Sequence, residues 1–407
     1  MSGGERGGDV VCGGDWRIAA VGARNVGAVT TVQDVCDQIE AWYPSELAES
    51  WDAIGLVVGR PGASVRSILV AVDVTETVVS EAIAQGADLI LAHHPLLFGG
   101  VTSVSADDAK GRIVHDLIEN GIALLVAHTN ADSGADGVSD ALATALGIDE
   151  RRALQPTSIG PLDKFVVFVP EGQFEAVLDA MAEAGAGRIG AYERCAFRSP
   201  GEGTFRPMPG AEPHIGSVGQ TERVAESRLE IVAARKLRSA VVAAMRATHP
   251  YEEPAFDIVE LAEIPGHLGL GRIGNRGETV TLAEFAEIVA RGLPATHHGV
   301  RVAGDLARPV RRVAVCGGSG DSLMAAANAA GADVYVTSDL KHHAVSEHLA
   351  DGGCAVIDVA HYASEFPWCG LVAQRLANTF TASDDNVSVH VSTSVTDPWS
   401  HHLRSQS

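Results

Sequence analysis

The sequence predicts an α/β protein with two related lobes and a ferredoxin-like domain inserted between them. Short apolar strands alternate with amphipathic helices before residue 161 and again after residue 265. This alternation is typical of mostly parallel sheets covered by helices. Residues 82–95 and 327–343 share one order of features, which suggests two related lobes. The stretch between the lobes follows a different pattern, with two β-α-β units.

The first lobe is expected to begin near Thr30. An amphipathic helix is predicted over 31–43, because apolar side chains recur there at helical spacing: Val32, Val35, Ile39 and Trp42. Strands and helices then alternate, with strands at 67–75, 88–92 and 122–132 and helices at 76–87 and 110–121. Binding groups on such sheets gather at the carboxyl ends of the strands.

The late stretch 327–343 resembles residues 82–95. Each has a helix that ends in Gly-Ala-Asp, then an apolar strand, then a polar end with two histidines. Ordinary convergence of βαβ units would also produce this similarity. If the similarity is real, it implies two lobes that face each other across a cleft. Residues 354–365 add one more strand with a polar end.

The middle of the chain predicts a small ferredoxin-like module at about 162–264. A strand is expected at 164–169 and a helix at 171–186. After a segment rich in glycine and proline, residues 227–249 supply a strand and a helix, and 256–261 a further strand. This order of elements is typical of a split β-α-β fold.

Composition excludes several classes of protein. The 407 residues include 30 Lys and Arg against 52 Asp and Glu, a formal net charge of −22. That balance argues against nonspecific binding of nucleic acid, which needs a cationic face. The six cysteines include no CxxC pair, which indicates a reduced, cytoplasmic protein. No apolar run has the roughly 18 residues of a membrane span, and residues 1–29 are expected to be a disordered leader.

Five side chains are candidate metal ligands. His93 and His94 follow the strand at 88–92, and Asp132 follows the next one. His361 and Glu365 share a face if a helix begins at residue 361. Nitrogen and carboxylate ligands suit zinc, manganese, iron, cobalt or nickel, and a carboxylate can bridge two ions. Capping, turn and surface roles are the alternatives for each group taken alone.

The region around these candidates holds further polar groups. Asp52 and His128 are either partners that orient the ligands or buried structural groups. The glycine-rich residues 317–322 resemble a phosphate-binding turn, but they lack the lysine of a P-loop, so a tight turn is the simpler interpretation.

Five ordered motifs closely resemble the GTP cyclohydrolase 1 type 2 homologue family, also called the Nif-three-like family. They are ESWDAIGLVVG (49–59), GADLILAHHPLLFGG (86–100), VAHTNADSGADGVSDALA (126–143), GGSGDSLMAAANAAGADVYVTSDLKHH (317–343) and DVAHYASE (358–365). The resemblance covers about residues 31–399. Residues 190–216 and 247–259 resemble the PII-like domain of the longer family members.

The resemblance implies a dinuclear metal site in the cleft between two lobes and a toroidal homohexamer. The implied ligands of two divalent cations are His93, His94, Asp132, His361 and Glu365, with one imidazole of the HHP motif on each ion and Glu365 bridging. The implied domains are an N-terminal lobe at 30–161, the PII-like insert at 162–264, a C-terminal lobe at 265–399 and a tail at 400–407. The family's usual TGD triplet is Thr337-Ser338-Asp339 here, and Ala360 replaces a glycine.

The function implied by the resemblance is metal-dependent hydrolysis, in which metal-activated water attacks a purine nucleotide or a similar small substrate. For GTP the attacked carbon lies between the two imidazole nitrogens of guanine, and formate leaves. No side chain beyond the metal ligands is assigned a catalytic role. The alternative is a metal-binding regulatory or metal-handling hexamer without turnover, whose PII-like insert senses a small ligand.

Overall fold

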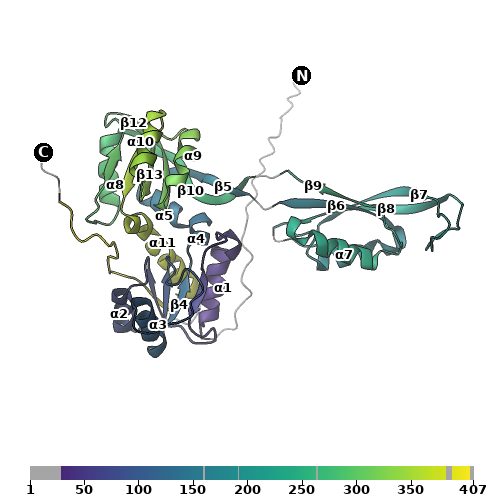
Figure 1. Cartoon of the computed structure of the whole chain (residues 1–407), viewed down its shortest axis with the longest axis horizontal. Helices are drawn as coiled ribbons and strands as arrows, with labels where there is room; N and C mark the ends of the chain where they lie inside the picture. Colours follow the sequence, from purple (N-terminus) through teal and green to yellow (C-terminus); the bar gives the residue numbers. More distant parts are fainter. Residues whose placement is uncertain (1–28, 159–160, 191, 263–264, 382–386, 404–407) are drawn as a thin grey trace, which may run out of the picture. The chain divides into compact units, whose positions relative to one another are not determined.

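The computed structural model describes residues 29–158, 161–190, 192–262, 265–381 and 387–403 (Figure 1). The predicted leader therefore lies outside the described residues, apart from residue 29. Residues 158–264 form one compact unit, hereafter the insert. The described residues on either side of them form the second unit, hereafter the main unit. Both units are mixed α/β, as predicted.

The main unit contains a five-stranded sheet in the order β1-β4-β3-β2-β15. Strands β2, β3, β4 and β15 run parallel, while β1 pairs antiparallel with β4 at one edge. The strands β3 and β4 are buried along their whole length, which explains their uninterrupted apolar sequence. The bounds are β1 Gly55–Val58, β2 Ser67–Ala71, β3 Leu89–Ala92, β4 Ala123–Val126 and β15 Ser388–Val391.

Helices cover both faces of this sheet. One face packs on α2 and α3, and the other on α1 and α11. Helix α1 begins at a capping box, in which Thr31 and Asp34 bond to each other's backbone N–H. Helix α2 ends at Gly86, whose left-handed φ of 65° suits a residue without a side chain. The bounds are α1 Val32–Trp42, α2 Glu76–Gln85, α3 Ala109–Glu119, α4 Thr129–Ser133 and α11 His361–Thr381.

The second sheet of the main unit has six strands in the order β11-β14-β13-β12-β10-β5. Strands β12, β13 and β14 are parallel, and β10 and β11 pair antiparallel to them. The strands are β5 Asp149–Ser158, β10 Pro265–Thr281, β11 Arg301–Ala303, β12 Pro309–Ser319, β13 Val334–Ser338 and β14 Ala355–Val359. The helices are α5 Val138–Ala145, α8 Leu282–Gly292, α9 Met324–Ala329 and α10 His342–Ala350.

The insert is an antiparallel sheet with two helices on one face. Its chain order is β6-α6-β7-β8-α7-β9, and its strand order is β7-β8-β6-β9. Apolar residues of α6 and α7 pack on alternate residues of β6 and β8. The bounds are β6 Leu162–Pro170, α6 Phe174–Glu183, β7 Ala196–Phe205, β8 Glu222–Ala234, α7 Arg238–Thr248 and β9 Phe256–Glu260. Short 3-10 helices occupy Ser45–Leu47, Glu171–Gln173, Arg235–Leu237 and Asp321–Leu323.

Three details differ from the sequence prediction. The strand expected at 122–132 ends at Val126, and Asp132 lies in the short helix α4 that follows it. The strand expected at 67–75 ends at Ala71. Strand β7 was not predicted, because it contains a proline and two glycines; these are tolerated at the edge of a sheet. No helix in the described ranges has the length and apolar character of a membrane span.

Tyr43 ties α1 to α11 in the core of the main unit. Both Tyr43 and Trp368 are fully buried. The Tyr43 hydroxyl donates to the Asp136 carbonyl (2.8 Å) and accepts from Trp368 Nε1 (3.2 Å). Arg375 also donates to the hydroxyl at 3.3 Å and lies over the Trp42 ring. The phenol thus bonds to polar groups of two segments that are distant from it in sequence, the turn at Asp136 and helix α11.

Tyr43→Phe is expected to lower the free energy of unfolding of the main unit by about 1–3 kcal/mol, because it leaves the buried Trp368 N–H without an acceptor. Urea denaturation followed by tryptophan fluorescence measures this change. The control is Tyr192→Phe, which removes a hydroxyl from a side chain that is exposed in the insert. An unfolding midpoint for Tyr43→Phe equal to that of the control would contradict the assigned role.

Candidate metal centre

The candidate site lies where strand ends of both sheets of the main unit meet. His93 and His94 follow β3 directly, and His361 is the first residue of α11, just after β14. Asp132 approaches from α4. Parallel strands present their carboxyl ends at the same edge of a sheet, which is where loops bring binding groups together. All five predicted ligands thus come together.

His93 and His94 both turn toward Glu365. The Nε2 atom of His93 lies 3.5 Å from Glu365 Oε1, and that of His94 lies 3.1 Å from Glu365 Oε2. On an extended segment, consecutive side chains would point to opposite sides. The chain instead bends at these two residues, immediately after β3 ends. The bend directs both rings to one point, with their centroids 5.0 Å apart.

Helix α11 brings His361 and Glu365 onto one face, four residues apart. His361 Nε2 lies 3.0 Å from Glu365 Oε1 and 3.3 Å from His94 Nε2. Glu365 is only 2% exposed. Its oxygens therefore face different imidazoles, with Oε1 toward His93 and His361 and Oε2 toward His94.

Three buried atoms of this cluster form no hydrogen bond of acceptable geometry with the described residues, although each lies 3.1 to 3.7 Å from a charged neighbour: His93 Nε2, Asp132 Oδ1 and Glu365 Oε2. Buried polar atoms without partners are costly, so native structures rarely keep them unless something else binds there. Imidazole nitrogens and carboxylate oxygens are the donor set of zinc and related divalent ions. The residues present therefore fit a metal ion, and two overlapping groups of three side chains have the spacing to hold one.

A second layer of hydrogen bonds orients the imidazoles. The Nδ1 atoms of His94 and His361 lie 2.7 Å from Asp73 and 2.6 Å from Asp339. His93 Nδ1 lies 2.9 Å from the Ala127 carbonyl. An Nδ1–H that donates to such an acceptor leaves the Nε2 lone pair free, and metal-ligating histidines are usually held in this way.

His128 extends the cluster beyond the predicted ligands. Its ring nitrogen lies with those of His93 and His94 in one of the candidate metal groups. His128 Nδ1 is 2.8 Å from Asp52 Oδ1, and the Thr129 N–H donates to the other oxygen of Asp52. The predicted role of Asp52 as an orienting partner agrees with this geometry. The sequence signal that could have identified His128 as a site residue is its place in the HTN triplet after β4.

Burial and mutual attraction act in opposite directions on the charges of the site. Burial alone would lower the pKa of His94, but Glu365 and Asp73 outweigh it and raise that pKa to about 10. Burial would raise the pKa of Glu365, but the histidines hold it well below its ordinary value. The pKa of Asp132 rises to about 6, chiefly through burial. Protons on the imidazoles thus balance the carboxylates, and a cation would have to replace them.

The cluster opens into a cavity of about 870 Å³. Two aromatic side chains stand at its wall around His128: Trp51, 58% exposed, and Phe98, 52% exposed. Gly318 also lines it, with a left-handed φ of 68°. A β-carbon there would lie 2.5 Å from Glu365 Oε1, so only glycine allows the backbone this close to the carboxylate. Residues 317–319 form the end of strand β12 and residues 321–323 a short 3-10 helix, so the prediction of a tight turn over 317–322 is wrong.

Other polar residues near the site belong to the surrounding loops and helix ends. Asn130 bonds the Tyr43 carbonyl and the His128 N–H, which makes it a cap. Lys341 and His343 are exposed and do not line the cavity. The residues that sequence reasoning missed are Asp73 and Asp339, whose partners lie 21 and 22 residues away along the chain.

Comparison with known proteins shows the same architecture in relatives that match most of the chain. The profile of the family Duf34/NIF3 (NGG1p interacting factor 3) matches residues 30–398. Two proteins named GTP cyclohydrolase 1 type 2 homolog are 51% identical in Mycobacterium tuberculosis and 40% identical in Bacillus subtilis. Each match spans 90% of this chain, and 96% and 97% of the respective relatives. The crystal structure of Staphylococcus aureus protein SA1388 has a TM-score of 0.76 at 30% identity, over 92% of this chain and 99% of that one.

The double variant His93→Ala, Glu365→Ala is expected to lose nearly all bound divalent metal, because it removes a buried imidazole and the carboxylate that faces three imidazoles. Elemental analysis after dialysis measures the metal content. The control is His343→Ala, Glu347→Ala, which removes the same two residue types from exposed positions on α10. Metal content equal in both double variants would remove these residues from the ligand set.

Proposed function

Because the chain belongs to the Duf34/NIF3 family, we propose that it is a divalent-metal-dependent hydrolase acting on a purine nucleotide or a similar small molecule. The observation that carries this proposal is that three buried atoms without a hydrogen bond, on His93, Asp132 and Glu365, lie together, and that Asp132 and Glu365 also line a large cavity. The relatives named GTP cyclohydrolase 1 type 2 homolog suggest the substrate class.

The proposed ligands of two cations are His93, His94, Asp132, His361 and Glu365. The different neighbours of the two Glu365 oxygens support a bridging role for this carboxylate. A divalent cation bound there supplies electrophilic stabilisation and makes water a stronger acid. Asp73, Asp339 and the Ala127 carbonyl keep three ligands in their binding orientation.

His128 is the residue best placed to move a proton. Asp52 holds its Nδ1, which leaves Nε2 as the proton acceptor at the cavity wall. A base oriented by a carboxylate in this way is the usual arrangement for general acid–base catalysis. Trp51 and Phe98, on either side of His128, offer exposed aromatic surface on which a purine base can stack. In the proposed reaction one water adds to the imidazole carbon of guanine and opens the ring to a formamide, and a second water hydrolyses this formamide so that formate leaves.

Asp132→Asn is expected to reduce formate release from GTP at least about tenfold, because the amide keeps the shape of the side chain but loses its charge. The control is Asp136→Asn in the following turn, where the side chain is 68% exposed and asparagine tolerates the left-handed φ of 50°. The measurements are formate yield and metal content of the purified proteins. Wild-type values of both for Asp132→Asn would exclude Asp132 as a ligand.

We further propose that the main unit consists of two related lobes with the metal site in the cleft between them, and that the insert is a PII-like domain. In both sheets a histidine closely follows a parallel strand, His93 after β3 and His361 after β14, and this repeat supports the first proposal. The strand order β7-β8-β6-β9 with both helices on one face supports the second, because a ferredoxin-like module has that arrangement.

The chain is proposed to assemble as a toroidal homohexamer, as its resemblance to the family implies. Light scattering coupled to gel filtration should then give a mass six times the 42.3 kDa of one chain. The mass should not depend on whether metal is present if the assembly rests on protein contacts alone. A monomeric or dimeric mass across a hundredfold range of protein concentration would contradict the assembly.

A further inference from the structure

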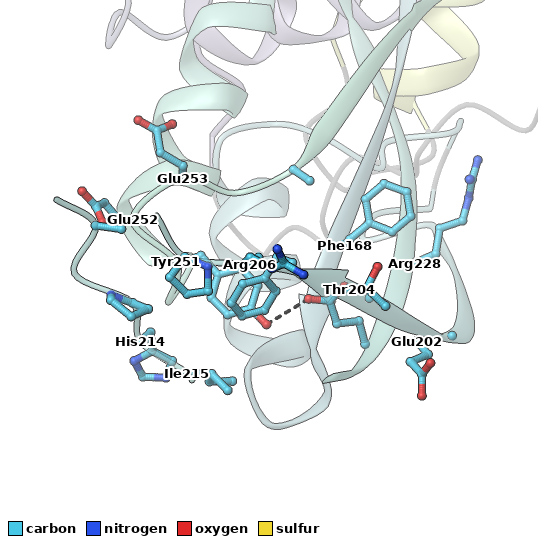
Figure 2. Close-up of a pocket in the computed structure, with 18 of the residues that line it drawn as sticks. Phe168, Glu202, Thr204, Arg206, His214, Ile215, Arg228, Tyr251, Glu252 and Glu253 are labelled. Carbon is cyan, nitrogen blue, oxygen red and sulfur yellow. Dashed lines mark hydrogen bonds between the residues drawn. The ribbon is translucent and has the colours of Figure 1, made fainter. Parts of the chain in front are cut away.

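The insert contains a cavity of its own, of about 530 Å³ (Figure 2). Its walls come from strands β7 and β8, from the segment that follows β7 and from the segment that follows α7. All of its lining residues lie within the insert, so the cavity is complete without the main unit. Its volume falls in the range of about 300–1,000 Å³ that small-molecule sites occupy.

A buried carboxylate lies in this cavity. Glu226 is only 7% exposed, and its Oε1 accepts a hydrogen bond of 2.9 Å from the Tyr251 hydroxyl, drawn as a dashed line in Figure 2. Across the strand pair, a β-carbon at Gly203 would lie 2.0 Å from Glu226 Oε2. Because residue 203 is a glycine, there is room for the Glu226 carboxylate over β7.

Three other charged groups of the cavity have partners, whereas Glu226 forms no ion pair among the described residues. Glu202 pairs with Arg223, and Arg228 pairs with Glu230. Arg206 donates to the Thr221 hydroxyl. Within the described part of the insert, no lysine, arginine or histidine forms an ion pair with Glu226. A buried carboxylate with a single hydroxyl donor is incompletely compensated. A ligand that brings N–H donors would supply the compensation.

The remaining wall is suited to a flat ligand. The rings of Phe205 and Tyr251 lie 5.6 Å apart, and Phe168 also lines the cavity. Such rings bind planar groups by stacking and bind cations through their π-faces. The lining holds four glutamates, Glu202, Glu226, Glu252 and Glu253, against two arginines, Arg206 and Arg228. This balance favours a neutral or cationic ligand over one that carries phosphates.

From these features we propose that the insert binds a small planar ligand through two adjacent N–H donors that both face the Glu226 carboxylate. A guanine base without phosphates has such an edge, and so does a guanidinium group. An adenine base presents a donor next to an acceptor, and the acceptor would repel the carboxylate. This site does not depend on the metal centre or on the proposed hydrolysis.

Calorimetric titration of the full chain tests the proposal with three probes: guanosine, methylguanidinium and adenosine. If guanosine binds, the natural ligand is a guanine base; if methylguanidinium binds, it is a cationic guanidinium group. Adenosine should bind at least about tenfold more weakly than the ligand that binds. The proposal is overturned if neither guanosine nor methylguanidinium binds at millimolar concentration, or if adenosine binds as tightly as guanosine.

Two variants place the binding in this cavity. Glu226→Gln keeps the shape but turns a carboxylate oxygen into an amide donor, so affinity should fall at least about tenfold. Its control is Glu183→Gln, an exposed glutamate of α6 outside the cavity. Gly203→Ala should displace the carboxylate and weaken binding, whereas Gly172→Ala should not, because residue 172 lies outside the cavity and its β-carbon would have nothing within 4 Å.

Thermal melting of each variant checks that the insert stays folded. If Gly203→Ala melts early, Glu226→Gln still decides the result, because it adds no atom. Wild-type affinity in Glu226→Gln would mean that the ligand binds elsewhere in the chain, and would overturn the proposal.

Discussion

The burial of the Glu365 carboxylate is the constraint on which the main unit depends. A carboxylate at 2% exposure is costly unless positive charge and hydrogen bonds surround it. The structure meets that cost with three imidazoles, at 3.0 to 3.5 Å from its oxygens. Those imidazoles come from segments about 270 residues apart, since His94 and His361 are separated by 267 positions. The contacts at this site therefore link the two sheets of the main unit to each other.

The same carboxylate explains features that lie outside the ligand set. Gly318 has no side chain because a β-carbon would meet Glu365. Helix α11 carries both Glu365 and Trp368, and Trp368 is buried against Tyr43. One helix therefore contributes to the candidate metal site and to the core of the first sheet. Asp73 and Asp339 orient His94 and His361 from opposite sheets. A substitution at any of these positions would change the surroundings of the Glu365 carboxylate.

Much of this could be predicted from the sequence, because the signals are local. The capping box at Thr31 and Asp34 and the apolar period define α1, and the spacing of His361 and Glu365 places both on one helix face. Other features depend on distant partners. The contact between His128 and Asp52 joins residues 76 positions apart, and no pattern near His128 reveals it. Strand β7 is stabilised by pairing with β8 and not by its own propensity, since it contains Pro200, Gly201 and Gly203.

The two buried glutamates among the described residues differ in how their charge is compensated, and this difference indicates what each can bind. Glu365 faces three nitrogens that can lose protons, which makes its surroundings a place where a cation exchanges with protons. The Glu226 carboxylate accepts a hydrogen bond from the Tyr251 hydroxyl, which keeps its proton because burial and the carboxylate raise its pKa far above the ordinary value. No imidazole of the described insert lies within ion-pair distance of Glu226. A site of the first kind suits a metal ion, whereas the second requires a ligand that brings its own N–H donors.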